Sequence, residues 1–579
     1  MLYPKLKEIP TSRELIDVFK GYNHNLRIGE GEFYDMKNLS SDNFPVLSPR
    51  PKRGVYAVPA IPQGIVAKDS LCYVDGGDFI INEHRVSMGL TADDKPKTLI
   101  SMGAYVIIMP DKKYINTADL TDYGSIEASV KTQGTVTFEL CRVDGVGYDD
   151  VVTQTTPPTN AENMDLWIDT SETPHQLKQY SSTTAMWSAI ATTYIKISAT
   201  GIGKPFSVND GVTIEGVESE ILSDLNASMV IWAKGDNYIV VTGILDQVTT
   251  QDTAITITRK MPNMDFIIES ENRLWGCRYG VAVNGEIVNE IYASKLGDFK
   301  NWNCFMGIST DSYVASVGTD GQFTGAITHL GYPLFFKENC VHKVYGNYPA
   351  NYQIQTTACR GVQKGCERSL SIVNEVLYYK ARSGICAYDG SLPVEISYAL
   401  GEMSYHNAAA GTLGNKYYIS MSDANEEWHL FVYDTLKSMW HREDSTQAVD
   451  FCNCRGELYY IDYADNQIKA VRGTGATETS PINWQAVTGI IGTDSPDKKY
   501  ISRMDVRMSL EVGTRVSFFA EYDSSGEWEH LFTMDGVKLK TFAVPIRPQR
   551  CDHMRLKIIG NGEAKIFSIC KTFEQGSDV

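Results

Sequence analysis

Two groups of closely spaced carboxylates are the first candidates for chemistry in this sequence of 579 residues. Asp149 and Asp150 are adjacent, and the stretch DLWIDTSE supplies Asp165, Asp169 and Glu172. Hydrolysis of a glycosidic bond needs two carboxylates that flank the sugar. However, the chain carries 71 acidic and 53 basic residues, so acidic loops are expected without any catalytic role. We therefore do not predict a glycosidase from these residues.

Aromatic and turn residues add limited support for a carbohydrate site. Trp167 and Trp187 offer flat faces on which sugar rings can stack. The stretch YDSSGEW at 522–528 resembles the Asp-box turn of sialidase propellers, but its Asp-to-Gly spacing is one residue too long and it occurs once. These features keep glycan binding open as an alternative.

Two further stretches come close to nucleotide and nucleophile motifs. Gly201-Ile202-Gly203-Lys204 is similar to part of a phosphate-binding loop, but Ser198 stands where the first glycine is needed and Pro205 follows the lysine. The stretch GISTD at 307–311 ends in Asp where a nucleophile elbow needs Gly. Neither stretch predicts a binding or catalytic site.

Histidine and cysteine give no metal or catalytic pattern either. His429 and His441 fall in one predicted unit, without a recognisable Ser or Cys nucleophile. Cys452-x-Cys454 and the Cys359–Cys366 spacing do not match a zinc knuckle, so we expect buried, reduced thiols. We predict no catalytic, cofactor-binding or metal-binding residues, no cofactor, and no enzyme.

The net charge of −18 bears on partners. A protein that grips nucleic-acid phosphates is expected to be basic. The densest basic run is PRPKRG at 49–54, which we interpret as a solvated turn, with contact to an acidic partner or DNA as the alternative. Residues 1–20 lack the apolar run of a signal peptide, and we expect a soluble chain without a membrane-spanning segment.

The elements that would position these residues are strands. One helix is expected near the start, where TSRELIDVF combines a capping box at Thr11 and Glu14 with an apolar stripe. After it, short alternating runs between Gly, Asn and Asp turns predict an all-β protein.

A short aromatic-rich strand recurs seven times along the chain. Its fourth residue serves as a marker, and the markers are Tyr73, Val106, Trp275, Phe335, Tyr378, Tyr418 and Tyr459. From Phe335 onward they recur about every 40 residues, the period of a four-stranded propeller blade. We predict a β-propeller of six to eight blades. In this scheme NEIYASKLGDFKNW at 289–302 is a blade corner, and Trp302 packs between blades, with a platform for a sugar ring as the alternative.

A longer gap between Val106 and Trp275 predicts an insertion of one or two small β-domains. The last hundred residues alternate as in RMDVRMSL, and RLKIIGNGEAKIF is expected to form a hairpin at Gly560–Gly562, which predicts a β-sandwich. The predicted division is 1–123, the N-terminal segment and first blades; 124–262, the insertion; 263–478, the remaining blades; and 479–579, the C-terminal β-sandwich.

Several stretches together resemble the propeller-type tail nozzle and packaged-DNA-stabilisation proteins of tailed bacteriophages and related prophage proteins. They are NHNLRIGEGEFYDMKNLSSDNFPVLSPRPKRG, NEIYASKLGDFKNW, GYPLFFKENCVHKVYGN and RPQRCDHMRLKIIGNGEAKIFSI. The likeness covers about three quarters of the chain and leaves out the insertion.

The resemblance implies a virion structural protein of the tail or neck that assembles in the host cytoplasm. Such a subunit forms a ring, expected to be a hexamer, below the portal and adaptor, and contacts other tail proteins. Its channel retains packaged DNA and passes it on ejection without sequence-specific binding, and an acidic lumen would suit that role. The alternative is a receptor-binding or baseplate protein that recognises a host surface glycan through the insertion.

Overall fold

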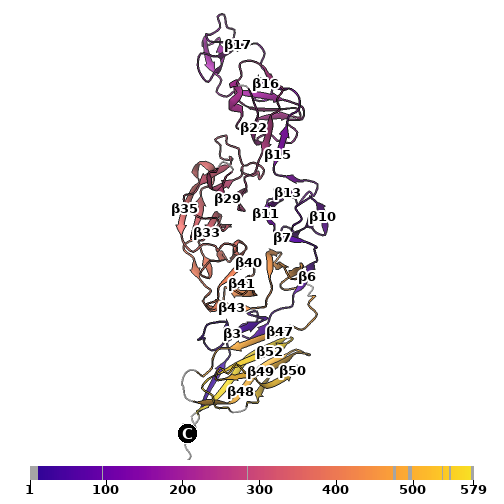
Figure 1. Cartoon of the computed structure of the whole chain (residues 1–579), viewed down its shortest axis with the longest axis vertical. Coiled ribbons are helices and arrows are strands. Elements are labelled where there is room, and N and C mark those ends of the chain that lie inside the picture. Colours follow the sequence, from indigo (N-terminus) through magenta and orange to yellow (C-terminus); the bar gives the residue numbers. More distant parts are fainter. Residues whose placement is uncertain are drawn as a thin grey trace, which may run out of the picture.

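The structure is a computed structural model that describes residues 11–93, 95–218, 220–282, 285–473, 477–492, 498–536, 539–546 and 549–575. The molecule is elongated, with a ring of small sheets between a two-lobed insertion at one end and a sandwich at the other (Figure 1). In the described ranges, helical structure is limited to four 3₁₀ turns: η1 (Glu220–Leu225), η2 (Pro349–Asn351), η3 (Glu367–Ser369) and η4 (Tyr398–Leu400). The all-β prediction is confirmed.

Seven four-stranded units form the ring in the part of the chain that the structure describes, within the predicted six to eight. Blade 1 holds β7 (Pro62–Ala67), β8 (Leu71–Asp75), β9 (Asp78–Ile81) and β10 (His84–Ser87). Blade 2 holds β11 (Thr98–Met102), β12 (Tyr105–Met109), β13 (Lys113–Asn116) and β14 (Tyr123–Ser125). Blade 3 holds β28 (Phe266–Ser270), β29 (Arg273–Val281), β30 (Ile287–Ala293) and β31 (Tyr313–Ser316). Blade 4 holds β32 (Gly325–His329), β33 (Tyr332–Lys337), β34 (Cys340–Tyr345) and β35 (Gln353–Ala358).

The remaining blades complete the circle. Blade 5 holds β36 (Ser371–Val373), β37 (Val376–Lys380), β38 (Ile385–Tyr388) and β39 (Val394–Glu395). Blade 6 holds β40 (Tyr405–Leu413), β41 (Lys416–Asp423), β42 (Trp428–Asp434) and β43 (Met439–Arg442). Blade 7 holds β44 (Ala448–Cys454), β45 (Glu457–Asp462), β46 (Ile468–Ala470) and β6 (Gly54–Ala57). Because β6 comes from the N-terminal side of blade 1, its antiparallel pairing with β46 joins the two ends of the ring.

The first strands of the blades surround the ring axis. The first strand of blade 7, β44, contacts both β40 and β7, and β11 contacts both β7 and β28. The seven markers lie in the second strands, where aromatic and apolar side chains fill the space between neighbouring sheets. Trp275 of blade 3 and Phe335 of blade 4 share one buried cluster. Each sheet thus covers the apolar face of the next, which a single small sheet cannot do alone.

The blade corner at 289–302 behaves as predicted. Its chain leaves β30, turns at Gly297 with a positive φ of 71°, and returns through Phe299 to Trp302. Trp302 is buried with Phe299 among residues of blades 2 and 3, and its indole N–H donates to the Phe299 carbonyl oxygen at 3.0 Å. The packing role predicted for Trp302 is confirmed.

The insertion carries three sheets. They are built from β15 (Ala128–Lys131), β16 (Val136–Cys141), β17 (Val151–Gln154), β18 (Leu166–Asp169), β19 (Gln176–Ser181), β20 (Met186–Ala189), β21 (Tyr194–Ser198), β22 (Gly211–Glu215), β23 (Ser228–Val230), β24 (Ala233–Gly235), β25 (Tyr238–Thr242), β26 (Thr249–Gln251) and β27 (Thr256–Arg259). The first and last of these, β15 and β27, pair antiparallel, so the chain enters and leaves at one place. Asn301 of the blade corner ties the insertion to the ring, because its amide binds Asp210 and the Gly211 N–H, both at 2.9 Å.

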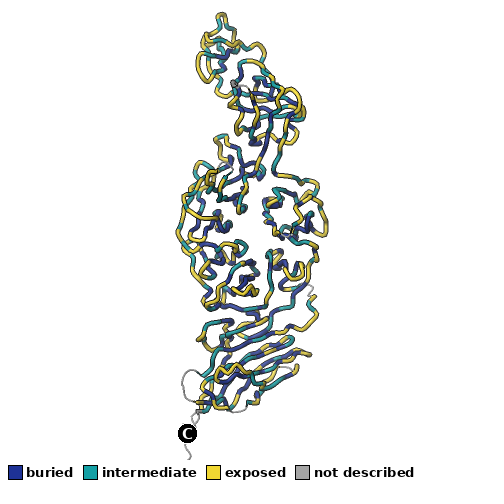
Figure 2. The backbone as a smooth tube through the Cα atoms, in the orientation of Figure 1, coloured by how far each residue is buried: buried dark blue, intermediate teal, exposed yellow. Residues whose placement is uncertain are grey.

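The sandwich joins both ends of the chain. One sheet has the order β1 (Thr11–Ile16), β53 (Ala564–Gln575), β48 (Lys499–Leu510), β51 (Lys540–Val544). The other contains β2 (Gly21–Tyr22), β3 (Glu32–Lys37), β47 (Asn483–Thr488), β52 (Met554–Asn561), β49 (Arg515–Tyr522) and β50 (Glu529–Asp535), and continues through β43 into blade 6. The short pair β4 (Leu39–Ser40) and β5 (Ser48–Pro49) lies between β3 and β6 in the sequence. Figure 2 shows the buried segments that run from the ring into this sandwich.

Two local predictions in the sandwich are wrong. Residues 11–16 form an edge strand on β53 and not a helix, because pairing with that strand outweighs the local helical pattern. Gly560–Gly562 does not turn a hairpin, since β52 and β53 belong to opposite sheets. Gly560 instead gives room to Trp484, which a Cβ would meet at 2.0 Å. The predicted domain boundaries stay predictions.

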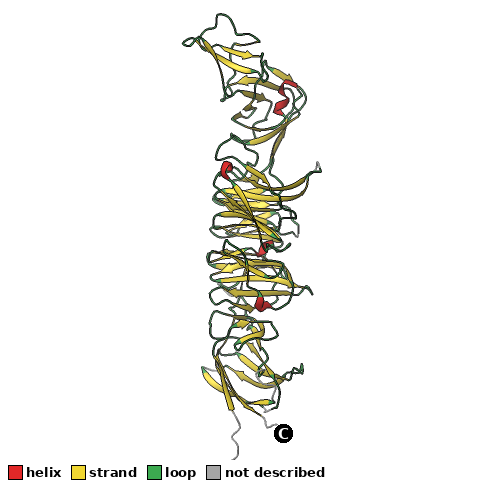
Figure 3. Ribbon diagram, turned by 90° about the vertical axis from the view of Figure 1, so that its left-hand side faces the viewer, coloured by secondary structure: helices red, strands yellow, loops and turns green. Residues whose placement is uncertain are grey.

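The edge-on view in Figure 3 shows strands throughout the length of the molecule. Among the described residues, no helix combines the length and apolar character that a membrane crossing requires.

Candidate functional site

The centre of the propeller is hollow, and two cavities of about 560 and 480 Å³ share the residues Pro96, Glu367 and Arg368. The smaller cavity lies on the ring axis, because the first strands of five blades contribute to its wall. The contributing residues are Ile65 of blade 1, Leu99 of blade 2, Ile267 of blade 3, Ala326 of blade 4 and Phe451 of blade 7. The axial channel, as we call these two cavities, is therefore built by the ring as a whole.

An ion pair crosses the axial channel. Arg368 of η3 lies 2.8 Å from the Asp450 carboxylate of β44, and it also donates to the Lys97 carbonyl oxygen at 3.1 Å. Burial raises the pKa of Asp450, although the charge of Arg368 acts in the opposite direction. A carboxyl group that binds its proton more tightly than usual thus faces the channel.

A second carboxyl group with a raised pKa lines the same cavity. Asp265 directly precedes β28 and is an exposed residue of the cavity wall, and partial burial of its carboxyl group raises its pKa. The Tyr279 N–H donates to Asp265 Oδ2 at 2.8 Å and opposes that rise. Glu367 is the third carboxylate at the channel, after Asp450 and Asp265, and Arg368 is the arginine beside them.

The wider cavity is lined by groups that suit hydroxyl-rich ligands. Its wall contains the amide side chains of Asn407, Gln447 and Asn466 and the aromatic side chains of Trp428 and Tyr463. Amides donate and accept hydrogen bonds, and aromatic faces pack on the C–H faces of sugar rings.

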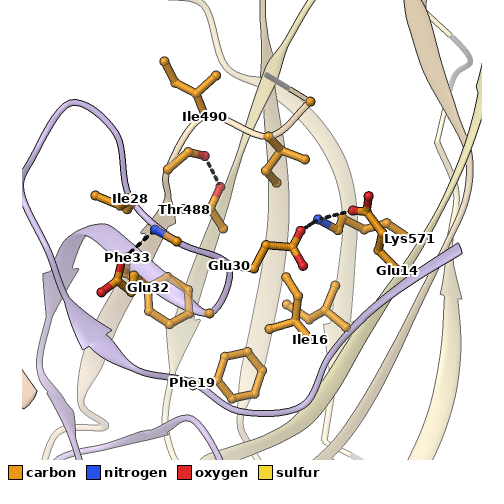
Figure 4. A pocket seen from close by; sticks show the side chains of 16 residues that line it. Glu14, Ile16, Phe19, Ile28, Glu30, Glu32, Phe33, Thr488, Ile490 and Lys571 are labelled. Carbon is orange, nitrogen blue, oxygen red and sulfur yellow. Dashed lines mark hydrogen bonds and ion pairs between the residues drawn. The ribbon is translucent and has the colours of Figure 1, made fainter. Parts of the chain in front are cut away.

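A separate pocket of about 270 Å³ lies in the sandwich (Figure 4). Lys571 is completely buried there, with its Nζ 3.2 Å from Glu14 and 2.6 Å from Glu30. Ile16, Phe19 and other apolar side chains form the remaining wall. These ion pairs tie β53 to β1 and to the loop before β3, which is a structural role.

The carboxylates predicted from the sequence lie in the insertion, away from the axial channel. Asp169 is buried and paired with Lys178 at 2.7 Å, and hydrogen bonds from Lys178 and Ser171 lower its pKa to about 2. Asp165 accepts from the Glu162 N–H at 2.7 Å and closes a turn. A carboxylate held ionised in a salt bridge is a poor proton donor. Asp149, Asp150 and Glu172 are exposed.

The two tryptophans of the insertion pack mainly on each other. Their ring centroids are 5.4 Å apart in an edge-to-face arrangement, and Lys178 covers Trp167. Trp167 is 3% exposed, so it cannot serve as a platform for a sugar, while Trp187 is half-buried.

The other motif-like stretches form turns. A Cβ on Gly203 would lie 2.1 Å from the Gly235 carbonyl oxygen, so this glycine serves close packing. In GISTD, buried Asp311 accepts from the N–H groups of Met306, Gly307 and Ile308. Asp523 of YDSSGEW accepts from the Asp552 N–H at 2.8 Å. None of the three is arranged as a reaction centre.

The basic run at 49–54 is not a solvated turn. Arg50 pairs with Glu478 at 3.0 Å, and Arg53 pairs with Glu443 at 2.6 Å and Asp444 at 2.9 Å. Both arginines are buried at the junction of blade 7 and the sandwich. Both guanidinium groups form ion pairs within the protein, with acidic residues that are distant in the sequence.

Four of the ten histidines are buried, and they are His329, His342, His429 and His441. Burial lowers the pKa of His441 to about 3. All twelve cysteines are free thiols. Nine of them, including Cys366 and Cys454, are buried as expected, and Cys359, Cys452 and Cys570 are half-buried.

The sequence reasoning missed Asp265, Glu367, Arg368 and Asp450. A signal was present, since the dipeptide Asp-Phe occurs at 265–266 and 450–451, each one strand before a marker aromatic. The same dipeptide also occurs at 78–79 and 298–299, so only its place relative to the marker distinguishes it.

No family model and no curated protein matches the chain. Among solved structures, it is similar to an exo-β-1,3-galactanase from Phanerochaete chrysosporium, with 9% identity, a TM-score of 0.21, and coverage of 53% of this chain and 94% of that one. It is also similar to a family 43 arabinoxylan arabinofuranohydrolase from Bacillus subtilis, with 7% identity, a TM-score of 0.18, and coverage of 53% and 94%. At these values the matches say nothing of substrate or mechanism.

The solved structures named above are glycoside hydrolases. The predicted function as a virion ring subunit for DNA retention and ejection finds no support among them, and neither does the prediction of no enzyme. The alternative of a host-glycan receptor-binding or baseplate protein is not supported either. The resemblance to the phage family, the ring of identical subunits and the place in a virion stay predictions.

Proposed function

We propose that the axial channel binds a carbohydrate and hydrolyses a glycosidic bond. The observation that carries this proposal is that two carboxyl groups, Asp265 and Asp450, line one central cavity, and that partial burial shifts the pKa of each upward. Glycoside hydrolysis uses a carboxylic acid with a raised pKa together with a second carboxylate.

The surroundings of the two groups favour different roles. Arg368 lies 2.8 Å from Asp450 and offsets part of the rise in the pKa of this carboxyl group, so of the two groups Asp450 is the better suited to act as nucleophile or base. Asp265 accepts a hydrogen bond from the Tyr279 N–H, a neutral donor, which suits the proton donor to the leaving oxygen. The amides and aromatic rings of the wider cavity then hold the neighbouring sugars.

The test is hydrolysis of a panel of plant, fungal and bacterial polysaccharides and aryl glycosides, read as released reducing ends or phenol. We expect turnover by the wild type, and a loss of about 10²-fold or more in kcat for Asp265→Asn and for Asp450→Asn. Asp69→Asn, an exposed carboxylate of blade 1, is the control and should keep full activity.

Two results would contradict the proposal. One is a folded wild type that turns over no glycan in the panel. The other is activity that persists in both channel variants, which would place the chemistry elsewhere.

A further inference from the structure

Three metal-ligating side chains converge at the hairpin between β41 and β42 of blade 6. The ligand atoms of Asp423, Glu427 and His429 all lie within 4.8 Å of one another. In the antiparallel pair, residue 422 faces 428 and residue 421 faces 429, so these three side chains share one face of the hairpin. The fold therefore brings them together before any ligand binds.

The turn itself fixes the first of these ligands. Asp423 Oδ1 accepts from the N–H groups of Asn425 at 2.8 Å and Glu427 at 3.0 Å. Its other oxygen, Oδ2, remains directed at His429 Nε2, 3.1 Å away. One carboxylate oxygen thus holds the loop while the second faces the cluster.

The two nitrogens of the His429 imidazole have different surroundings. The residue is 7% exposed, and its Nδ1 is buried without a hydrogen-bond partner among the described residues. Rings of Tyr405 and Phe431 pack around it, with centroids 5.8 Å away in each case. His429 therefore presents only Nε2 to the cluster, and the packed rings hold the imidazole in this orientation.

The burial of the cluster suits a bound cation. Asp423 is 2% exposed and His429 is 7% exposed, so protein atoms would surround most of the ion. Glu427 is exposed and completes the set from the solvent side.

We infer that Asp423, Glu427 and His429 form a binding site for one divalent transition-metal ion such as Zn²⁺. One imidazole nitrogen and two carboxylate oxygens are a ligand set that zinc accepts, with a water in the fourth position. The site lies on the hairpin that also carries Trp428, whose side chain lines the axial channel. A bound ion would brace this hairpin, and the inference does not depend on the chemistry proposed for the channel.

The experiment uses full-length protein without a polyhistidine tag, stripped with EDTA and dialysed. Titration with ZnCl₂ by calorimetry should show one ion per chain, and the Co²⁺-loaded protein should show the visible absorption of a four-coordinate site. His429→Gln and Glu427→Gln should each weaken Zn²⁺ binding by about 10–100-fold or more.

Glu426→Gln is the matched control, because Glu426 is an exposed carboxylate of the same turn that is outside the ligand set. It should change affinity by less than about threefold, as expected for a screened surface charge. Glu427→Gln alters an exposed side chain, so it tests the site even if His429→Gln disturbs folding. Absence of stoichiometric binding by the wild type, or equal losses in Glu426→Gln and Glu427→Gln, would overturn the inference.

Discussion

At the scale of single residues, burial decides what the charged groups of this protein do. Arg50 and Arg53 look like a solvent-exposed basic patch in the sequence, yet both are buried against carboxylates. Asp169 looks like a catalytic candidate and is held ionised by Lys178, whereas Asp265 and Asp450 attracted no notice and have raised pKa values. The number of charges was readable from the sequence, but their partners were not.

The Arg53 ion pairs lead to a stability prediction. Arg53→Ala should lower the free energy of unfolding by about 3–5 kcal/mol, because Glu443 and Asp444 would be left buried without their partner. Urea or thermal unfolding measures the change. The exposed Arg85 pairs with Asp75 and Asp78, and Arg85→Ala should cost about 1 kcal/mol or less. Equal costs for both variants would contradict a special role of the junction.

At the scale of elements, tertiary pairing overrides local pattern. Residues 11–16 satisfy the sequence rules for the start of a helix, but in the fold they extend the sheet next to β53. The register places Ile16 opposite Ile569 and Leu15 opposite Cys570. Neighbouring residues of a strand face opposite sides, so only one of the two apolar side chains is buried.

This alternation makes the strand assignment testable. Ile16→Ala should lower the free energy of unfolding by about 2–4 kcal/mol because Ile16 is 9% exposed. Leu15→Ala should change it by less than about 0.5 kcal/mol because Leu15 is 58% exposed. Chemical denaturation of both variants is the measurement. Similar losses at both positions would favour a helix whose apolar stripe buries the two side chains together.

At the scale of the whole molecule, the chain enters and leaves the insertion at one place. Because Ala128 faces Arg259 in the pairing of β15 with β27, the two ends of the insertion are adjacent. Its described residues form two hydrophobic clusters of their own, separate from the clusters of the propeller blades. The contacts of Asn301 with Asp210 and Gly211 would be exchanged for contacts with water if the insertion were removed.

Excision of residues 129–258 with a short Gly-Ser linker should therefore leave a folded propeller and sandwich. We expect a soluble protein with a cooperative thermal unfolding transition, and the activity proposed for the axial channel should persist. Circular dichroism and calorimetry give the first readout, and the glycan panel gives the second. An excised protein that aggregates or lacks a transition would show that the ring needs the insertion in order to fold.

The sequence by itself determined the all-β class, the repeated blade and the packing role of Trp302, because these depend on local alternation and on an aromatic that returns with each unit. It also indicated the insertion, because a gap in a regular repeat is visible along one dimension. Only the tertiary structure decided which blades meet at the axis, and so which of the 71 acidic residues share a cavity. Asp265, Glu367 and Asp450 come from different parts of the ring, and only the closed ring brings them to the wall of one cavity.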